Sequence, residues 1–399
     1  MGFSQGLSGL SAAAKALDVV GNNIANSQTV GFKAGSVSFA DIFAGSTGMG
    51  VQVAGVDQNF GDGNLANGSS ALDMGISNRG FFRMVDAAGS VFYGRNGQFE
   101  QDENGFIVNK TNGLFLTGYQ ATDGAINPGA QVGPIRIPKD DMPPAASTKG
   151  SLTGNLKSDA ELITKAPFDP DDKDTYNYVN EVTAFDSLGN KHTIKMYYVH
   201  TKEGEWEVHA HDATSPDKTN EWTTETLTFG TDGYLTTPVS LNIKGAAYNG
   251  SAALDLNLDL SALSQNSGES QIMLGEIDGQ PPGKFNAYEV SDAGEVIAIY
   301  SNGKRQTVAQ VVLADFANVG GLAQQGNNLW AETGQSGQPF LGTSGSGSFG
   351  TINGGMLETS NVDLGGEMVN MIVYQRNYQS NSQTIKTQSE VLQTLVNLR

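Results

Sequence analysis

The chain has 399 residues, a formal net charge of −19 at pH 7 and no cysteine. Its length allows two or three domains, and the absence of cysteine excludes disulfides, thiol nucleophiles and cysteine-based zinc sites. The acidic balance argues against nucleic acid and anionic membrane surfaces as partners, because both attract clustered Lys and Arg. We also expect no membrane insertion, because the sequence contains no apolar run of 18 residues.

Residues 1–27 are predicted to form a helix with one narrow apolar stripe. Steps of four and three residues are typical of a coiled-coil seam, although a core helix can mimic a short run of them. A cleaved secretory signal is not expected, because Lys15 and Asp18 interrupt the apolar stretch. The stripe consists of Phe3, Leu7, Leu10, Ala14, Leu17, Gly21 and Ile24.

The next part of the chain is predicted to be β structure. We interpret residues 28–70 as an extended connector with local β structure, including one strand near Val51 and Val53. From residue 71, short apolar runs alternate with Asn-Gly and Ala-Gly turns, which are typical of antiparallel hairpins. They predict a middle β domain over 71–145, resumed at 281–359.

Residues 146–280 are predicted to form an inserted, outer β domain that faces solvent, because most of the net negative charge lies there. Trp206 and Val208 alternate with His209 and His211 on one strand. Two histidines on one strand face can bind a metal, but we expect these two to point into solvent. The acidic run 169–174 lacks the glycine and final Glu of an EF-hand loop, so we interpret it as a solvated loop.

The motifs of common enzymes are missing. The chain has no Gly-x-Ser-x-Gly elbow and no phosphate-binding loop. Gly345-x-Gly347-x-x-Gly350 has the dinucleotide spacing, but it lies among further Gly and Ser residues rather than between a strand and a helix. We therefore predict that the protein is not an enzyme and has no cofactor, metal or catalytic residue. The glycine-rich segment 334–355 is predicted to be loop.

A second helix is predicted from about residue 361, capped by Asn361 or Asp363, with Glu367 near the positive end of the helix dipole. With the first helix it would form a terminal assembly domain of residues 1–27 and 360–399. The predicted fold is thus multidomain and mainly β, with nested β domains and paired terminal coiled-coil helices. The second stripe consists of Leu364, Met368, Met371, Gln375, Tyr378, Ser382, Ile385, Ser389, Leu392 and Val396.

Both ends also carry longer motifs. The runs 18–33 and 360–398, with Leu72-Asp73-Met74-Gly75-Ile76 and Tyr93-x-Arg95-x-Gly97-x-Phe99, resemble the signatures of bacterial flagellar rod and hook proteins. The large block 146–280 favours a hook subunit over the shorter rod proteins. The terminal motif residues that carry the resemblance are Asn22, Asn23, Asn26, Gly31, Phe32, Lys33, Asn361, Asp363, Gln375, Arg376 and Tyr378.

The resemblance implies a structural subunit of the flagellar hook, a curved helical tube that acts as a universal joint between motor and filament. It implies that the chain polymerises with itself and meets rod, hook–filament junction, hook cap, export and length-control proteins. It also implies type III export without a cleaved signal peptide and an extracellular location in the flagellum. The alternatives are a distal rod protein, which would form a straight tube, and a secreted β-domain adhesin or carbohydrate-binding protein.

Two further expectations concern mechanics. Gly21, Gln375, Ser382 and Ser389 weaken the stripes, because polar seam residues and glycine lower coiled-coil and helix stability. We therefore expect both ends to be disordered in the monomer and helical in the polymer. The glycine-rich segments 44–63 and 334–355 are expected to act as compliant links.

Overall fold

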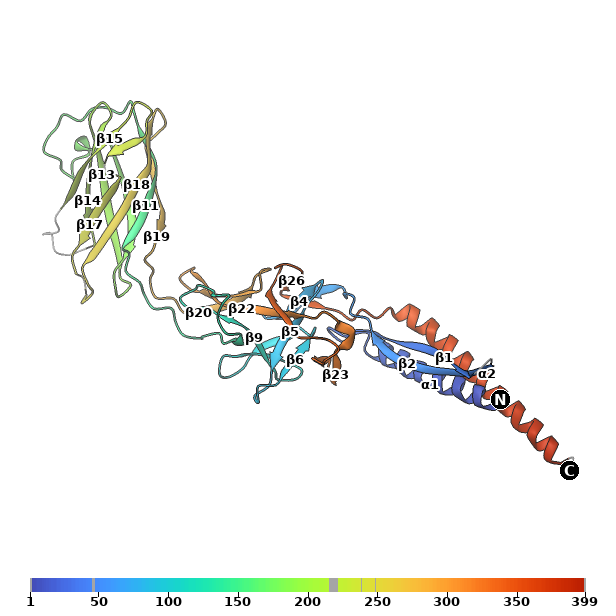
Figure 1. The fold of residues 1–399 in the computed structure, drawn as a ribbon. Helices are drawn as coiled ribbons and strands as arrows, with labels where there is room; N and C mark the ends of the chain where they lie inside the picture. The colour runs from blue at the N-terminus through green and yellow to red at the C-terminus, as the bar shows by residue number, and fades with distance from the viewer. Residues whose placement is uncertain (1, 45–46, 215–221, 238, 248, 398–399) are drawn as a thin grey trace. The chain divides into compact units, whose positions relative to one another are not determined.

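The computed structural model describes residues 2–44, 47–214, 222–237, 239–247 and 249–397. The chain is mainly β, with a long helix at each end, α1 (Gly2–Ala25) and α2 (Leu364–Asn397) (Figure 1). It divides into two compact units: unit 1 contains residues 1–139, 287–299 and 305–399, and unit 2 contains 140–286 and 300–304. No helix within the described ranges is long and apolar enough to cross a membrane. The predicted fold class is confirmed.

In unit 1, α1 packs against both α2 and a long hairpin (Figure 1). The hairpin consists of β1 (Gly35–Ala44) and β2 (Thr47–Gln58), which pair antiparallel, with Val37 opposite Val56 and Phe39 opposite Val53. The predicted strand near Val51 and Val53 is β2, but its partner β1 was not predicted. The alternation of Val37 and Phe39 with small or polar residues carried the missing strand signal.

The rest of unit 1 is built around a 12-stranded sheet whose main path is β20-β21-β22-β9-β5-β6-β24-β23. Its aromatic core holds Phe81, Tyr93, Phe316 and Trp330. The 12 strands of this sheet are β5 (Phe81–Val85), β6 (Val91–Gly94), β7 (Phe99–Gln101), β8 (Ile107–Asn109), β9 (Phe115–Gln120), β10 (Gly133–Pro134), β20 (Phe285–Val290), β21 (Glu295–Tyr300), β22 (Arg305–Asp315), β23 (Ala323–Gly326), β24 (Leu329–Ala331) and β25 (Phe340–Thr343). Two strand pairs lie outside it: β3 (Leu65–Asn67) with β27 (Met356–Glu358), and β4 (Met74–Ser77) with β26 (Thr351–Gly354).

The prediction that 334–355 is all loop was wrong for two stretches. β25 pairs with β22, and β26 pairs with β4. A Cβ atom at Gly350 would overlap the carbonyl oxygen of Ser77, and one at Gly97 would overlap that of Met74. Glycine at these positions therefore allows two backbones to touch. The number of glycines in a segment does not show whether they serve such close contacts or make the chain flexible.

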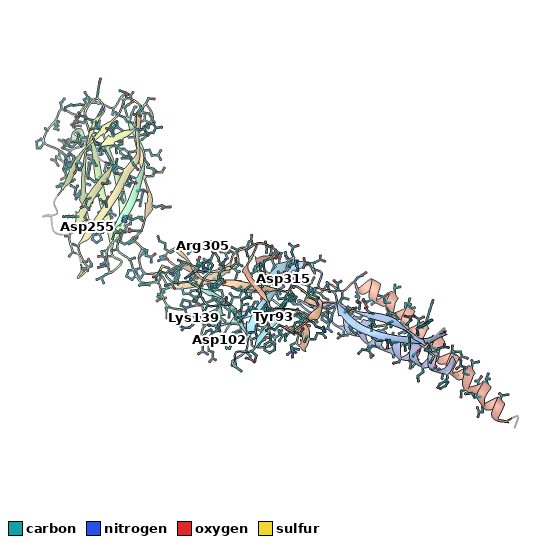
Figure 2. All side chains as sticks on the ribbon, in the orientation of Figure 1. Tyr93, Asp102, Lys139, Asp255, Arg305 and Asp315 are labelled. Atoms are coloured by element: carbon teal, nitrogen blue, oxygen red, sulfur yellow. The ribbon has the colours of Figure 1, made fainter. Side chains whose placement is uncertain are left out.

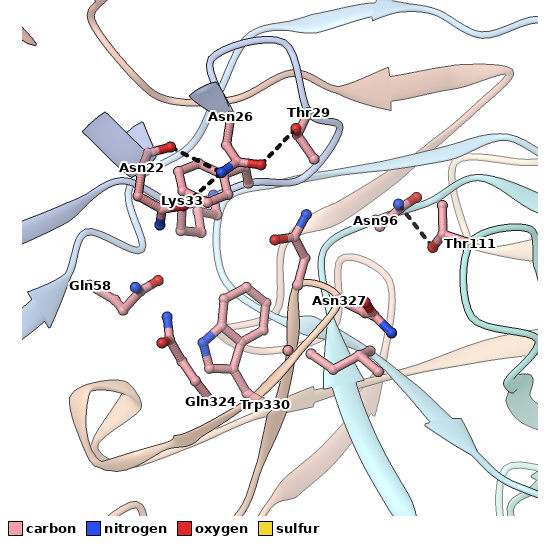
Figure 3. A pocket seen from close by; sticks show the side chains of 14 residues that line it. Asn22, Asn26, Thr29, Lys33, Gln58, Asn96, Thr111, Gln324, Asn327 and Trp330 are labelled. Carbon is pink, nitrogen blue, oxygen red and sulfur yellow. Dashed lines mark hydrogen bonds between the residues drawn. The ribbon is translucent and has the colours of Figure 1, made fainter. Parts of the chain in front are cut away.

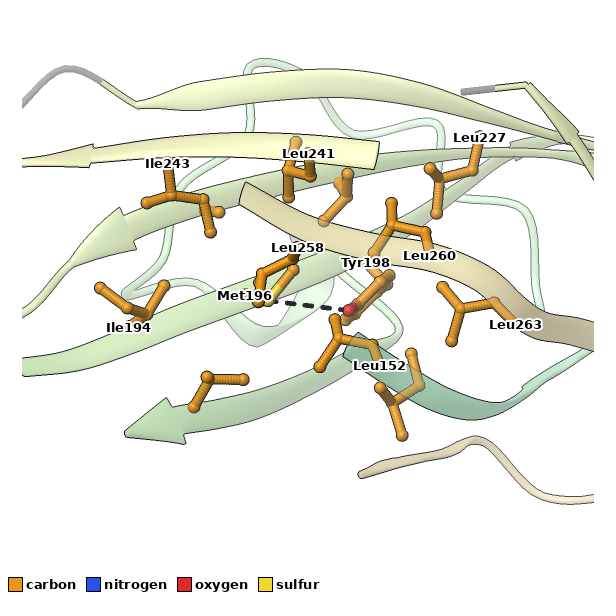
Figure 4. Packing of buried hydrophobic residues seen from close by; sticks show 14 of the residues in the cluster. Leu152, Ile194, Met196, Tyr198, Leu227, Leu241, Ile243, Leu258, Leu260 and Leu263 are labelled. Carbon is orange, nitrogen blue, oxygen red and sulfur yellow. Dashed lines mark hydrogen bonds between the residues drawn. The ribbon is translucent and has the colours of Figure 1, made fainter. Parts of the chain in front are cut away.

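Unit 2 contains two sheets, with strand orders β17-β18-β11-β19 and β12-β13-β14-β15-β16. Alternate residues of β18, from Leu254 to Leu260, enter a core shared with Leu152, Met196 and Tyr198 of other strands (Figure 4). The strands are β11 (Lys149–Lys157), β12 (Tyr178–Phe185), β13 (Lys191–Lys202), β14 (Glu205–Asp212), β15 (Thr223–Phe229), β16 (Leu235–Thr237), β17 (Ser240–Gly245), β18 (Leu254–Asn266) and β19 (Gln271–Ile277).

The histidines of β14 do not point freely into solvent as expected. His209 is buried and stacks on Phe168, with ring centroids 4.2 Å apart, and its Nδ1 lies 3.0 Å from Thr224 Oγ1. His211 is half-buried beside Trp222. Burial lowers the pKa of both imidazoles. Phe168 and Trp222 lie outside β14, so the alternation of residues along that strand does not predict that they cover its histidines.

The unit 2 core supports a direct stability test. Leu258 is fully buried whereas Leu188 is exposed. Leu258→Ala is expected to lower the free energy of unfolding by about 2–5 kcal/mol through lost burial and a residual cavity. Leu188→Ala is expected to change it by less than about 0.5 kcal/mol. Urea unfolding of the full chain followed by tryptophan fluorescence measures both, and equal effects of the two variants would contradict this core.

Candidate assembly interface

The residues of α1 that are buried lie beside the apolar stripe predicted from the sequence, not on it. The predicted stripe contains mainly large residues, whereas most of the buried positions hold small ones. All the buried positions except Ala12 lie one residue before a position of the predicted stripe. A Cβ atom at Gly9 would lie 2.8 Å from Asn381 Nδ2, and one at Gly6 would lie 3.1 Å from Ile385 Cγ1. Small residues thus let α2 approach closely. The buried positions of α1 are Gly6, Ala12, Ala13, Ala16, Val20 and Asn23.

The large residues of the predicted stripes remain accessible. In α1, Leu7 is 54% exposed, Phe3 is exposed, and Leu10, Leu17 and Ile24 are half-buried. In α2, Leu392 is 57% exposed. The other α2 stripe residues divide into the exposed Leu364, Met368, Gln375, Tyr378, Ser382 and Ser389 and the half-buried Met371 and Ile385, while Val396 lies in the last turn of the helix.

Further apolar side chains of the helices and hairpin are exposed, including Val369, Ile372 and Val391 of α2 and Phe39 and Phe43 of β1. Side chains project from both helices and the hairpin along their length (Figure 2). Concentrations of exposed apolar residues mark interaction surfaces. We call this set the helical apolar surface: Phe3, Leu7, Phe39, Ile42, Phe43, Val56, Leu364, Met368, Val369, Ile372, Val373, Val391 and Leu392.

The two helices differ in length, so α1 cannot cover all of α2. They run antiparallel, because Gly6 faces Ile385 while the later Gly9 faces the earlier Asn381. α1 has 24 residues and α2 has 34. The α2 segment that contains Val391 and Leu392 therefore continues past the start of α1, and none of the other helices in the described ranges lies beside it.

A buried charge cluster joins the helical part of unit 1 to its β part. Lys33 Nζ lies 2.7 Å from Glu358 Oε1 and donates a 2.8 Å hydrogen bond to the carbonyl oxygen of Gly61. Arg95 Nη1 lies 3.1 Å from Glu358 Oε2 and 3.4 Å from Asp62 Oδ1. The side chains of Lys33 and Glu358 are 1% and 0% exposed. Burial, and next the Arg95 charge, lowers the pKa of Lys33, while Glu358 opposes this.

Two asparagines of the terminal motifs form hydrogen bonds to main-chain groups near the charge cluster. Asn361 accepts a hydrogen bond from the backbone N–H of Ala34 and donates to the carbonyl oxygens of Asn59 and Gly61. Asn23 exchanges two hydrogen bonds with the backbone of Gly35. Each side-chain amide connects its own segment to another main-chain segment, because its NH₂ group donates hydrogen bonds and its oxygen accepts them.

The other motif residues have varied surroundings. Gly31 has a φ of 68°, and a Cβ atom there would overlap the backbone of Arg95. Phe32 is buried, while Asn22 and Asn26 bond to one another at the end of α1. Asp363 rather than Asn361 caps α2, because its Oδ1 accepts from Gly365 N–H. Gln375, Arg376 and Tyr378 are exposed on α2.

The sequence reasoning missed the central role of Glu358. Its signal was weak: one acidic residue two positions before the C-terminal motif, and one cation, Lys33, at the end of the N-terminal motif. Asp62 was missed as well. Arg95 was noticed only as part of a motif, and its contact with Glu358 joins residues 263 positions apart.

Comparison with known proteins assigns the class first. Family models match residues 5–33 (flagella basal body rod protein), 75–154 (flagellar hook protein FlgE/F/G D1 domain), 155–280 (flagellar basal body protein FlaE D2 domain) and 353–398 (flagellar basal body rod FlgEFG protein C-terminal). These models place the chain among the flagellar rod and hook proteins.

Full-length relatives identify the family within that class. The chain is 50% identical to the flagellar hook protein FlgE of Salmonella typhimurium and 49% identical to that of Escherichia coli, in both cases over 100% of both chains. The fold is similar to the crystal structure of Helicobacter pylori flagellar hook protein FlgE2, with a TM-score of 0.56 at 18% identity over 74% of this chain and 100% of that one. The chain therefore belongs to the family of bacterial flagellar hook proteins, which are structural proteins.

The charge cluster generates a prediction. Glu358→Gln leaves the buried Lys33 and Arg95 without their shared carboxylate, so it is expected to destabilise unit 1 by about 3–5 kcal/mol. The double variant Lys33→Met with Glu358→Gln leaves one cation beside Asp62 and should recover part of this loss. The measurement is hydrogen exchange of the backbone amides of residues 27–36, compared with the parent chain.

The matched control is Glu289→Gln, which breaks an exposed ion pair with Arg305. It is expected to cost no more than about 1 kcal/mol, because exposed pairs contribute little. If Glu358→Gln leaves exchange at residues 27–36 as slow as Glu289→Gln does, the cluster does not hold this part of unit 1 together.

Proposed function

We propose that the chain polymerises with copies of itself into the curved tube of the hook, and that the helical apolar surface forms the contacts between subunits. The observation that carries the proposal is the exposure of large apolar side chains on α1, α2 and the hairpin while each helix is already paired. Burying such surface is the main driving force for association. Contacts between different faces of successive copies generate an open helical polymer.

In this proposal the predicted stripe residues act between subunits rather than within one. Phe3, Leu7, Met368 and Leu392 are exposed in the single chain and would be covered by the helices of neighbours. Leu10, Leu17, Ile24, Met371 and Ile385 are half-buried and Tyr378 is exposed in the single chain, and they would contribute further contacts. The part of α2 beyond the start of α1 would be completed by a neighbouring copy.

The position of each segment in the tube is also a proposal. The terminal helices of 1–27 and 360–399 would line the tube, followed outward by 71–145 with 281–359 and then by 146–280, joined through 28–70. The acidity of 146–280 supports an outer position, since like charges repel least where subunits are farthest apart. Such a tube would act as a universal joint that passes torque from the rod to the filament. We infer no catalytic role, metal or cofactor.

Location and partners follow from membership of the family. We propose that the subunit is exported by the flagellar type III apparatus without cleavage and acts outside the cell. The rod, the hook–filament junction, the hook cap and the export and length-control proteins are its proposed partners. Full-length similarity to hook proteins of two species supports the hook over the distal rod, and a curved polymer is the expected form.

The assembly proposal is tested at the end of α2. Leu392→Asp places a charge on the helical apolar surface and is expected to abolish hook formation and swimming in a bacterium that lacks its own copy. Burying an unpaired carboxylate costs several kcal/mol. The adjacent Gln393→Asp adds the same charge and should allow curved hooks to form, as seen by electron microscopy. Normal hooks with Leu392→Asp would show that this surface is not an interface.

A second prediction concerns order in the terminal helices. We expect the helical far-UV circular dichroism signal per residue to rise when the monomer polymerises, because Gly21, Gln375, Ser382 and Ser389 weaken the isolated helices. Removing residues 386–399 should abolish much of the rise. A monomer with the same signal as the polymer would show that both helices are already complete before assembly.

A further inference from the structure

A pocket of about 450 Å³ lies in unit 1, where α1 ends. Asn22 and Asn26 line it from α1, Gln58 from the end of β2, and Gln324, Asn327 and Trp330 from β23, β24 and the turn between them (Figure 3). We call it the amide pocket. Its lining includes one charged residue, Lys33, whose Nζ is already held by Glu358 and by the carbonyl oxygen of Gly61. The pocket therefore suits an uncharged, hydrogen-bonding group rather than an ion.

One buried donor of the amide pocket lacks a partner. Trp330 is 3% exposed, and its indole Nε1 has no hydrogen-bond acceptor within the described part of the chain. Leaving a buried donor unpaired is costly, so such groups are rare in folded proteins. The indole nitrogen and the amides of Gln58 and Gln324 gather on one side of the pocket (Figure 3). Gln324 and Asn327 are exposed, so their side chains can change rotamer when a group enters.

A carboxamide side chain matches these requirements. Its oxygen accepts from an indole or amide N–H, and its NH₂ group donates to the amide oxygens of Gln and Asn. A carboxylate would find no free cation, and an ammonium group would find no carboxylate, because Glu358 is already shared by Lys33 and Arg95. An apolar group would leave the Trp330 Nε1 donor unpaired.

The chain itself carries such groups on an exposed helix face. Gln375, Gln379 and Gln383 of α2 recur every four residues, so they lie on one side of the helix. All three are exposed. We call them the glutamine stripe. Met368 of the helical apolar surface lies seven residues before Gln375, so it projects from the same side of α2 as the glutamine stripe. A neighbour that covers Met368 therefore also meets these glutamines.

We propose that the amide pocket of one subunit receives a side chain of the glutamine stripe from a neighbouring copy. This inference rests on the proposed polymerisation through the terminal helices. The contact connects the inner helices of one copy to the base of the β part of the next. An entering carboxamide oxygen accepts from Trp330 Nε1 when Gln324 turns aside, and Asn327 completes the pairing.

The absence of cysteine makes cross-linking a clean test. Two single-cysteine variants, Asn327→Cys and Gln379→Cys, are expressed together in a bacterium without its own copy, and isolated hooks are mildly oxidised. A disulfide-linked dimer is expected with Gln379→Cys or with Gln375→Cys or Gln383→Cys on the same face. The control Asn377→Cys is also exposed but lies on another side of α2, and it should not cross-link.

The outcomes separate the two proposals. Intact hooks without a cross-link from any stripe position, or with an equal cross-link from Asn377→Cys, would overturn the pocket contact and leave polymerisation untouched. Failure of the parent chain to form hooks would overturn the proposed function itself.

A second measurement does not depend on cysteine. Trp330→Phe removes the Nε1 donor but keeps an aromatic ring, and Gln379→Leu removes the entering amide. Each is expected to raise the subunit concentration needed to extend isolated hooks by about three- to tenfold, the effect of one lost hydrogen bond. The double variant should be no worse than the more affected single variant, because both remove the same contact. Additive effects, or none, would contradict the proposal.

Discussion

The buried contact of Glu358 with Lys33 and Arg95 is the constraint on which unit 1 depends. Lys33 follows α1 in the chain, Glu358 precedes α2, and Arg95 belongs to the β part. One carboxylate therefore holds the beginning, the middle and the end of the chain at a single point. Removing three charges from water is expensive, and the cost is offset only when each has its partners in place. The cluster thus favours one arrangement of the two chain ends over other arrangements in which these charges would be buried without partners.

The asparagine side chains around the cluster stabilise the same region through uncharged hydrogen bonds. Asn23 and Asn361 each pair with main-chain groups that no strand partner satisfies. Since a buried unpaired amide costs as much as a lost hydrogen bond, these side chains are needed where the chain leaves regular structure. The ends of α1 and α2 are therefore aligned by polar contacts, which leaves their large apolar side chains available to other molecules.

The sequence predicted the nested layout, the two terminal helices and the hook family, because periodicity and long motifs are local signals. It missed what depends on contacts between distant residues. The apolar stripe of α1 was placed on Leu7 and Leu17, whereas the chain buries the adjacent Gly6 and Ala16. A hydrophobicity scale predicts that Leu is buried before Gly, but close packing of two helices favours the smaller residue. This preference becomes visible only when Asn381 and Ile385 are seen to face these glycines. Glu358 and the cover over His209 were missed for the same reason.

The backbone contacts at Gly97 and Gly350 have a mechanical consequence. Where side chains separate two strands, they can change rotamer and absorb a small displacement. Where a main chain touches a main chain, as Gly97 touches Met74 and Gly350 touches Ser77, no rotamer is available and close packing resists compression. We therefore expect that part of unit 1 to move as one rigid piece. In the proposed bent tube, each revolution would accordingly be accommodated at the surfaces between subunits rather than inside this part of unit 1.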